Sequence, residues 1–355
     1  MDERAKIPVA VLGATGAVGQ RFVQLLADHP WFEITALAAS DRSAGRRYAD
    51  AVRWVVPGDP PPTLRDKIVK ALRPDLPADL VFSALPSAIA REIEPAFARA
   101  GYAVCSNASA YRDAPHVPLL IPEINADHAR LIDRQRVERG WSGLIVTSPN
   151  CTTTGVAMAL KPLDVAFHLR TCFMASMQAV SGAGYPGVPS LDIMNNVIPY
   201  IPGEEEKFQQ ELSKMLGRME NGRLIDAEIS LSAHANRVPV LDGHTVSLSV
   251  GFEREITVED ALTTLRAYRA PEVAASLPSA LLNPLIVRTD PDRPQPRRDR
   301  DAAGGMAVTV GRVRPCPVLD LRLTTVTHNT LRGAAGGAVL NAELLVASGY
   351  VNHQP

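Results

Sequence analysis

The first 150 residues alternate between short apolar runs and segments with helical spacing of apolar positions. Near-continuous apolar runs are typical of strands buried on both faces of a sheet, and four of them are expected at 7–12, 32–39, 80–84 and 102–105. Helical spacing follows at 17–27 and 87–99. Strands alternating with helices predict a parallel, doubly wound sheet, so we expect an N-terminal Rossmann-type domain over residues 1–150.

Beyond residue 150 the pattern changes to longer segments of polar–apolar alternation. Such alternation predicts a largely antiparallel sheet covered on one face, with strands at 173–180, 225–233 and 244–252. A helix is expected at 256–269, and a solvated loop at 288–305, which is rich in Pro, Asp and Arg.

An apolar helix at 331–348 is expected to return to the first domain. The fold class is therefore α/β, with the Rossmann-type domain completed by the C-terminal segment 331–355 and an α+β catalytic and dimerisation domain over 151–330. We expect the sheet of the second domain to form the subunit contact, because its exposed face is apolar enough to need covering.

Composition narrows the functional classes. The net charge of −1 over 355 residues gives no electrostatic footprint for nucleic acid or an anionic membrane. No uncharged apolar run is long enough to span a bilayer, and residues 1–6 do not resemble a signal peptide. Four scattered cysteines without a Cys-x-x-Cys pair argue against zinc and disulfides, which predicts a soluble cytoplasmic protein without a metal.

A glycine-rich turn follows the first expected strand and opens the first expected helix. Glycines at such a turn let a pyrophosphate approach the helix N-terminus, although the G-x-x-G-x-x-G spacing is also compatible with a simple tight turn. The predicted cofactor contacts are Gly13, Thr15, Gly16, Ala17, Val18 and Gly19.

The end of the second expected strand bears on the choice between NADP and NAD. Small hydroxyls and arginine suit the 2′-phosphate of NADP, and Ser40, Arg42 and Ser43 provide them. Asp41 is an unfavourable charge there, and Arg46 with Arg47 is equally explained by a solvated loop. The segment favours NADP without excluding NAD.

Cys151 lies in the stretch Ser-Pro-Asn-Cys-Thr-Thr-Thr-Gly, between an expected extended segment at 143–147 and an expected helix at 155–161. The free N–H groups and the positive dipole end at a helix start favour a thiolate. A thiolate with a base nearby is a covalent catalyst, whereas a buried structural thiol is the alternative.

His244 is the histidine best placed to assist that cysteine, because it begins an expected strand directly after a turn. The other histidines, including His29 and His128, have ordinary surface settings, and a turn histidine without function remains an alternative for His244. Arg237 provides a guanidinium suited to a carboxylate or phosphate. Gln178 precedes a glycine-rich loop that could line a cleft, or it is a polar edge residue.

Two further segments carry candidate ligands. Glu204 and Lys207 share a face of an expected helix, where acids at the N-terminus are also simply stabilising. Asn107, Ser109 and Arg112 follow the carboxyl end of a strand, where open α/β sheets bind ligands.

Together these motifs resemble the aspartate-β-semialdehyde dehydrogenase family, in its archaeal and fungal-like branch. The matching segments span nearly the whole chain and are 13–20, 106–112, 148–155, 178–187, 203–207, 234–244, 329–336 and 340–344. Asp41 and the segment 288–305 depart from the family pattern.

The resemblance implies a role for each matching residue. Cys151 looks like the nucleophile, His244 the general acid/base and Gln178 the group that orients the acyl intermediate. The implied substrate ligands are Arg237 and Glu204 for the amino acid, Lys207, Arg112, Ser109 and Asn107 for the phosphate, and Asn150 beside the nucleophile. Further implied cofactor contacts are Ser83, Leu85, Gly182, Asn329 and Gly333.

The implied activity is the NADPH-dependent reductive dephosphorylation of L-aspartyl-4-phosphate to L-aspartate-4-semialdehyde through a cysteine thioester, in the biosynthesis of lysine, methionine and threonine. The implied partners are the small-molecule substrate, inorganic phosphate and further copies of the chain in a homodimer or homotetramer.

Two other functions stay open at this point. A malonyl-CoA reductase would use the same Cys and His with a CoA thioester, and the set Arg112, Lys207 and Glu204 argues against it. A non-catalytic cofactor-binding sensor would predict a damaged site, whereas Cys151 and His244 are both present. N-acetyl-glutamyl-phosphate reductase is a third relative that segments 148–151 and 203–207 fit poorly.

Overall fold

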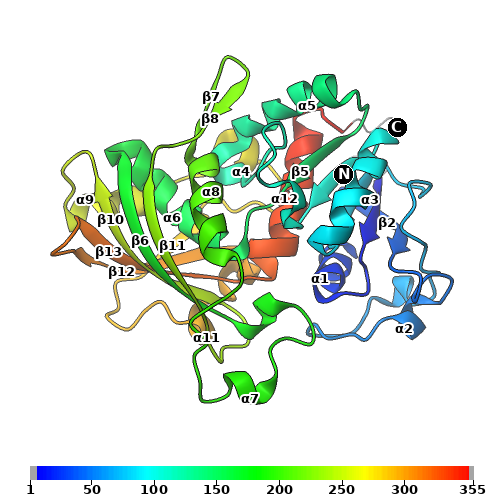
Figure 1. Ribbon diagram of the computed structural model, residues 1–355, viewed down its shortest axis with the longest axis horizontal. Helices are drawn as coiled ribbons and strands as arrows, with labels where there is room; N and C mark the ends of the chain where they lie inside the picture. Colours follow the sequence, from blue (N-terminus) through cyan, green and yellow to red (C-terminus); the bar gives the residue numbers. More distant parts are fainter. Residues whose placement is uncertain (1–5, 352–355) are drawn as a thin grey trace.

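The computed structural model describes residues 6–351, and it contains two large sheets of different construction (Figure 1). The C-terminal segment expected to complete the first domain, 331–355, lies partly outside these residues. So does the stretch 1–6, on which the signal-peptide prediction rests. The first sheet is parallel throughout, with strand order β2-β1-β3-β4-β5. Its strands are β1 (Ile7–Leu12), β2 (Phe32–Ala38), β3 (Leu80–Ser83), β4 (Ala103–Ser106) and β5 (Leu144–Thr147).

Both faces of this sheet are covered, which explains its near-continuous apolar runs. Helices α1 (Ala17–Leu26) and α12 (Gly336–Ala347) pack on one face, and α3 (Ser87–Arg99) packs on the other. In Figure 1 the red α12 lies beside the blue and cyan elements, although almost the whole chain separates them. The predicted C-terminal helix starts as a π-helix, η6 (Leu331–Ala335), before α12 begins.

The second sheet has six strands in the order β11-β12-β13-β10-β6-β9. Its three inner pairings are antiparallel and the two outer pairings are parallel, which confirms a largely antiparallel sheet. One face packs on α6 (Cys151–Phe167), α8 (Glu204–Leu216) and α9 (Val258–Ala267). The strands are β6 (Leu169–Gln178), β9 (Ser230–Arg237), β10 (His244–Phe252), β11 (Leu285–Val287), β12 (Val308–Pro315) and β13 (Leu321–Thr327).

Shorter elements connect these layers. The remaining helices are α2 (Tyr48–Ala51), α4 (Pro122–Asn125), α5 (Leu131–Arg139), α7 (Ser190–Ile193), α10 (Glu272–Ala275) and α11 (Pro296–Asp299). A hairpin consists of β7 (Arg218–Glu220) and β8 (Arg223–Ile225), and 3₁₀ turns are η1 (Pro62–Leu64), η2 (Ser109–Tyr111), η3 (Ala126–Arg130), η4 (Val180–Ala183) and η5 (Ala302–Gly305).

The strand expected at 225–233 was wrong in its position. The chain leaves β8 at Ile225, bonds through the Ala227 N–H to Ser213, and enters β9 only at Ser230. Positions 226–229 therefore link two sheets, because a hydrogen bond to α8 takes the place of a strand partner.

The outer face of the second sheet is more polar than expected. Phe173 is a large apolar residue exposed there, at 43 % of its surface. Its outward neighbours on β9 and β10 are polar: Ser230, Ser232, His234, Asn236, Thr245, Ser247 and Ser249. Alternation alone did not reveal this, because serine and threonine occupy the outer positions.

The segment 288–305 is not the solvated loop that its composition suggested. Asp299 on α11 is fully buried and pairs with Arg293 and Arg288. Arg300 donates to the carbonyl of Asp242 at 3.0 Å. Asp299 is thus satisfied by arginines of its own segment, and Arg300 attaches the segment to the turn that precedes His244. Arg297 and Arg298 remain exposed, so only part of the segment is solvated.

Two histidines expected at the surface are buried. His29 bonds through Nε2 to Glu343 of α12 at 2.8 Å. His128 is 1 % exposed, and its Nδ1 lies 3.1 Å from Nδ2 of Asn125. Both expectations were wrong because each ring has a distant or helical partner that its sequence neighbours do not indicate.

Candidate active site

Cys151 is the first residue of α6, directly after the turn that leaves β5. The helix was expected to begin at residue 155, but it begins four residues earlier because the Asn150 side chain caps it. Its Oδ1 accepts N–H groups from Thr152 at 2.8 Å and Thr153 at 3.4 Å. The thiol therefore stands at the helix N-terminus, as the sequence predicted.

His244, the first residue of β10, lies next to that thiol. Its Nε2 is 3.1 Å from Sγ of Cys151, although 93 positions separate the two residues. The ring is 1 % exposed, and Cys151 keeps part of its surface open to a cleft. The two residues expected to react together are thus in hydrogen-bonding contact.

The other ring nitrogen of His244 also has a partner. The backbone N–H of Ala179 donates to Nδ1 at 3.0 Å, so Nδ1 carries no proton. A neutral imidazole with an unprotonated Nδ1 carries its proton on Nε2. The ring therefore presents an N–H to the cysteine sulfur.

Burial dominates the electrostatics of this pair. It raises the pKa of the Cys151 thiol to about 12, assisted by Glu204 and opposed by Arg112 and Arg237. Burial, with the charge of Arg237, lowers the pKa of His244 to about 3. Burial therefore favours the uncharged form of each group in the uncomplexed pair, and it opposes the preference for thiolate that the helix start alone suggests.

Arg237 and Gln178 form the wall beside this pair. Arg237 is 6 % exposed, ends β9, and donates from Nη1 to the carbonyl of Ala179 at 2.9 Å. Gln178 ends β6, and its amide is 3.3 Å from Glu204. A side chain at Gly182 would lie 2.9 Å from Arg237 and 3.0 Å from His244, so glycine keeps this wall close.

Glu204 lies between the nucleophile turn and a lysine. Its Oε2 accepts from Nδ2 of Asn150 at 2.9 Å, and its Oε1 pairs with Nζ of Lys207 at 3.1 Å. Glu204 and Lys207 lie in the first turn of α8, and their spacing in the sequence had predicted that they share one helix face. Glu204 is 8 % exposed, so its charge is available only to groups inside the cleft.

Arg112 occupies the far end of the site, after the turn η2. Its Nη2 donates to the carbonyl of Asn107 at 2.9 Å, while its Nε and Nδ2 of Asn107 are buried donors without a protein acceptor. Ser109 bonds to Ser87 at 2.8 Å. Unsatisfied buried donors beside a guanidinium suit an oxyanion with several acceptors, such as phosphate.

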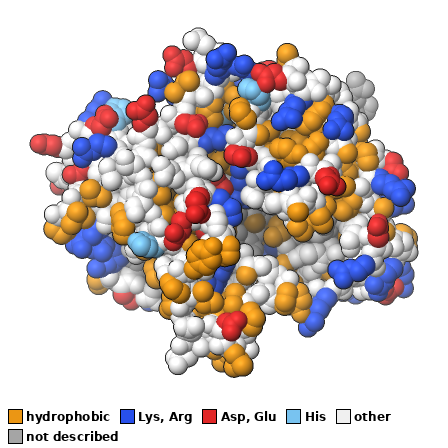
Figure 2. All heavy atoms as spheres, viewed as in Figure 1, with side chains coloured by type: hydrophobic (Ala, Val, Ile, Leu, Met, Phe, Trp, Pro, Cys, Tyr) orange, Lys and Arg blue, Asp and Glu red, His pale blue; other side chains and the backbone are white. Residues whose placement is uncertain are grey.

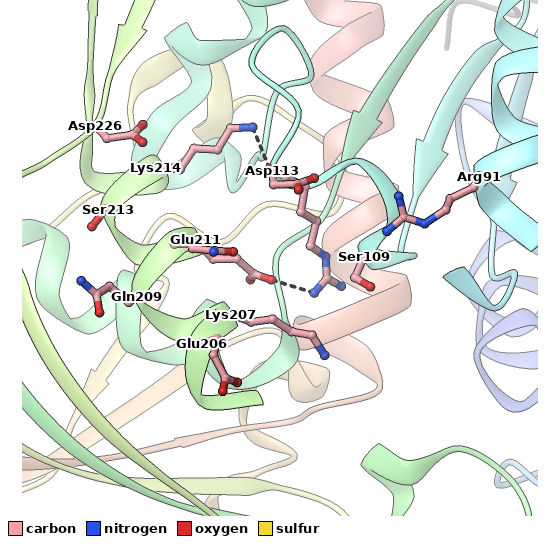
Figure 3. A pocket seen from close by; sticks show the side chains of 12 residues that line it. Arg91, Ser109, Asp113, Glu206, Lys207, Gln209, Glu211, Ser213, Lys214 and Asp226 are labelled. Carbon is pink, nitrogen blue, oxygen red and sulfur yellow. Dashed lines mark hydrogen bonds and ion pairs between the residues drawn. The ribbon is translucent and has the colours of Figure 1, made fainter. Parts of the chain in front are cut away.

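One residue of this end was missed by the sequence. Glu211 on α8 is 4 % exposed, pairs with Arg112 at 2.9 Å, and accepts the backbone N–H of Asn150 at 2.6 Å. Figure 3 labels Glu211 on α8 among the residues that line a cavity of about 800 Å³. Glu211 follows Glu204 by seven residues, and residues at that spacing share a helix face, so the sequence could have indicated that Glu211 also faces the site.

The glycine-rich turn and Cys151 line one cleft of about 800 Å³, whereas His244, Arg237 and Gln178 are buried behind this lining. Figure 2 shows the surface hollowed between the two large lobes, with charged side chains around the opening. The predicted residues that line this cleft are Thr15, Gly16, Ala17, Val18, Leu85, Asn107, Ser109, Arg112, Asn150, Cys151, Gly182, Glu204, Lys207, Asn329 and Gly333.

The turn fits a dinucleotide pyrophosphate. Gly16 precedes α1 without a side-chain cap, so the first N–H groups of the helix are free for an anion. A Cβ at Gly13, whose φ is +80°, would lie 2.8 Å from the carbonyl of Ala84, and one at Gly19 would lie 2.1 Å from that of Gly13. These glycines are therefore required by the backbone itself.

The structure does not bring every predicted cofactor residue to the cleft. Ser40, Arg42 and Ser43 form a turn after β2 and do not line it. Ser83 is fully buried at the end of β3, with its hydroxyl unpartnered. Their proposed contacts with the cofactor stay predictions.

Gly333 lines the cleft from the π-helix η6. A Cβ there would lie 2.7 Å from Cβ of Cys151, so the π-helix η6 packs directly on the nucleophile. Its neighbour Arg332 forms a fully buried, bidentate ion pair with Glu123, at 2.5 and 2.7 Å. This pair holds the π-helix in place.

Neither a metal-binding cluster nor a membrane-spanning helix is present among residues 6–351. No group of three or more His, Cys, Asp or Glu side chains there could hold a metal ion. No helix in the same range is long and apolar enough to cross a membrane.

Comparison with known proteins identifies the class. A family model described as "Semialdehyde dehydrogenase, NAD binding domain" matches residues 8–132, and one described as "Semialdehyde dehydrogenase, dimerisation domain" matches residues 160–332. These matches agree with the two sheets and place the chain among the semialdehyde dehydrogenases.

Individual relatives narrow this class. The aspartate-semialdehyde dehydrogenase of Archaeoglobus fulgidus is 53% identical over 340 residues, covering 95% of this chain and 97% of the relative. That of Methanothermobacter thermautotrophicus is 47% identical over 343 residues, covering 96% and 99%. The chain therefore belongs to the aspartate-semialdehyde dehydrogenase family, which confirms the resemblance.

A solved structure supports the same assignment. Aspartate semialdehyde dehydrogenase with NADP from Candida albicans has a TM-score of 0.90 and 40% identity, covering 97% of this chain and 99% of that one. The fold prediction and the prediction of a nicotinamide dinucleotide cofactor are confirmed. These relatives favour neither malonyl-CoA reductase nor a non-catalytic sensor.

Proposed function

We propose that this chain is an NADPH-dependent aspartate-semialdehyde dehydrogenase, which converts L-aspartyl-4-phosphate to L-aspartate-4-semialdehyde and inorganic phosphate. The observation that carries the proposal is the contact of 3.1 Å between His244 and Cys151, whose thiol lines the same cleft as the glycine turn. The names of the archaeal and fungal relatives support the same reaction.

The substrate spans the cleft with a different partner for each charged group. Arg237 binds the α-carboxylate and Glu204 the ammonium group, because the Arg237 guanidinium lies behind Gly182 beside the His244 ring and Glu204 lines the cleft next to Asn150. Lys207 and Arg112 bind the phosphate with Ser109 and Asn107. The acyl carbon then lies between these ends, within reach of Sγ of Cys151.

Sulfur attack opens the reaction. The thiol proton passes to the phosphate or to water as Sγ bonds to the acyl carbon, and the C–O bond to phosphate breaks. Arg112 and Lys207 stabilise the departing dianion. The bound NADPH supplies a hydride to the resulting thioester, and Gln178 orients its carbonyl.

His244 stabilises the oxygen that gains charge after hydride addition. Its Nε2–H donates a hydrogen bond to that oxyanion, and then to the sulfur when the C–S bond breaks and the aldehyde is released. Complete transfer of this proton is disfavoured, because a neutral ring that gave it up would become an imidazolate. Prior uptake of a second proton is also opposed, because a cationic ring would direct Nδ1–H at the N–H of Ala179. The released thiolate takes a proton from water, which restores the thiol.

The assay runs in the reverse direction. Purified protein supplied with NADP, phosphate and aspartate semialdehyde is expected to accumulate NADPH, followed by absorbance. Parallel reactions replace phosphate with CoA and the aldehyde with malonate semialdehyde. Turnover with that second pair alone would identify a malonyl-CoA reductase and reject the proposal.

The active form is proposed to be a homodimer, with a tetramer as the larger alternative. The dimerisation-domain match supports it. So do exposed apolar residues between 185 and 200, which Figure 2 displays on the projection around α7: Tyr185, Leu191, Met194, Val197 and Tyr200.

We keep residues 1–150 with 331–355 as the cofactor domain and 151–330 as the catalytic domain, and propose a cytoplasmic location from the four free cysteines.

A further inference from the structure

Glu211 is a buried carboxylate in contact with the phosphate end of the site that the proposed mechanism does not use. It lies on α8, two turns after Glu204, and only 4 % of its surface is exposed. It lines the cavity shown in Figure 3, which meets the active-site cleft at Ser109, Arg112 and Lys207. A charge so deeply buried is costly unless each oxygen has a strong partner.

Both oxygens of Glu211 bind parts of the active site. Oε1 accepts from Nη1 of Arg112 at 2.9 Å, and Oε2 accepts from the backbone N–H of Asn150 at 2.6 Å. One carboxylate therefore joins the guanidinium of the phosphate end to the residue that immediately precedes Cys151.

Asn150 is also bound from its other side. Its Nδ2 donates to Glu204, which pairs with Lys207. The two cations of the phosphate end are consequently connected to one asparagine through two glutamates. Arg112 keeps its Nε unpartnered while Glu211 and Asn107 hold its two terminal nitrogens.

We propose that Glu211 is a positioning residue for the phosphoryl group. By fixing Nη1, while the carbonyl of Asn107 holds Nη2, it presents the remaining N–H donors of Arg112 to an oxyanion of the phosphate class. Through the Asn150 N–H it holds the nucleophile turn at a constant distance from that anion. The inference rests on the proposed role of Arg112 in phosphate binding.

The surrounding loop does not depend on Glu211 for its shape. Lys214, one turn further along α8, donates to the carbonyls of Arg112, Ala114 and Val117 at 2.7, 2.9 and 2.9 Å. A substitution at Glu211 therefore leaves the loop anchored, and its effect on binding is separable from unfolding.

The test compares Glu211→Gln with Glu206→Gln in the phosphorylating direction. Glutamine keeps an acceptor for the Asn150 N–H but removes the charge that holds Arg112. We expect KM for phosphate to rise about tenfold, with kcat and the KM values for NADP and aspartate semialdehyde within about twofold. Glu206 is exposed on the same helix and cavity, so its variant is expected to match the wild type.

Glu211→Ala removes both acceptors. We expect the same loss of phosphate binding together with a slower rate of Cys151 alkylation by iodoacetamide, because the nucleophile turn also loses its support. A rise in KM for phosphate alone in Glu211→Gln, and the same rise with slower alkylation of Cys151 in Glu211→Ala, would support separate roles for the two oxygens.

Arg112→Ala separates failure of this inference from failure of the proposed site. An increase in KM for phosphate in that variant, with Glu211→Gln unchanged, would reject the role of Glu211 and retain the site. No change in either variant would reject both. A uniform fall of every constant and of the melting temperature in Glu211→Gln would mean that the residue is only structural.

Discussion

The backbone N–H of Ala179 donates to Nδ1 of His244, on the side of the ring opposite Cys151. This bond determines which nitrogen carries the proton, and it opposes protonation of the ring. Many cysteine enzymes hold a thiolate beside an imidazolium. Here the geometry favours a neutral pair, which becomes reactive when the bound substrate and its cations change the local charge.

The first prediction concerns the pH dependence of thiol reactivity. Because burial raises the pKa of Cys151 to about 12 and lowers that of His244 to about 3, the thiolate fraction grows throughout the neutral range. Iodoacetamide alkylation of the ligand-free enzyme is expected to accelerate about tenfold per pH unit between pH 6 and 9. A plateau reached below pH 7 would instead indicate a preformed ion pair.

The second prediction tests the nucleophile. Cys151→Ser should lower turnover by about a thousandfold or more, because a serine hydroxyl is far less ionised than a thiol. NADP binding, measured by fluorescence or calorimetry, should be unchanged because the glycine turn is untouched. Cys316→Ser, on a cysteine remote from the cleft, is the matched control, and equal activity of both variants would contradict the assignment.

The third prediction concerns the close approach of η6 to the nucleophile. A Cβ in Gly333→Ala would lie 2.7 Å from Cβ and 2.9 Å from Cα of Cys151, and backbone cannot move aside as a side-chain end can. We expect kcat to fall on the order of 100-fold, since small displacements of reacting atoms are costly. Gly251→Ala meets only ordinary contacts beginning at 3.5 Å and should retain full activity.

The fourth prediction links one buried acid to stability. Burial raises the pKa of Glu94 to about 7, partly offset by the hydrogen bond from Ser106 at 2.5 Å. The folded state therefore keeps a proton that the unfolded chain loses near pH 4.5, so the free energy of unfolding should fall by about 3 kcal/mol between pH 4.5 and 7 and then level off.

Glu94→Gln has no such proton to lose. Urea unfolding at pH 5 and pH 8 should show the variant gaining on the wild type by that amount as the pH rises. An advantage that shrinks with rising pH would have the wrong sign and would exclude a protonated, buried Glu94.

Local sequence could predict the parts of the site that depend on neighbouring residues. A cysteine after Ser-Pro-Asn predicts a helix start, and the glycines at 13, 16 and 19 predict a turn that the backbone indeed requires. The turn before an expected strand indicated His244, and the family resemblance added its role; the residue lies on β10 of the second sheet. Each of these signals is carried by a few adjacent residues or by a known motif.

Partners that meet only in the folded chain could not be predicted in this way. Glu211 reads as one more acid on an amphipathic helix until Arg112 and Asn150 approach it. Asp299 belongs to a charge-rich stretch that resembles a solvated loop, and arginines pairing with it allow its burial. The hydrogen bond from Ala179 to His244 comes from a backbone N–H, so the residue type at position 179 does not predict it.

The position of α12 bears on how this protein is made. Leu340, Leu344 and Leu345 lie in the same core as Val9, Val11 and Phe22, although the sheet they cover is synthesised within the first 150 residues. At translation rates of about 5–20 residues per second, the early sheet waits on the order of ten seconds or more with one face covered by α1 alone. A chaperone that shields nascent apolar surface would find its binding site there, and release would coincide with emergence of the last helix from the ribosome.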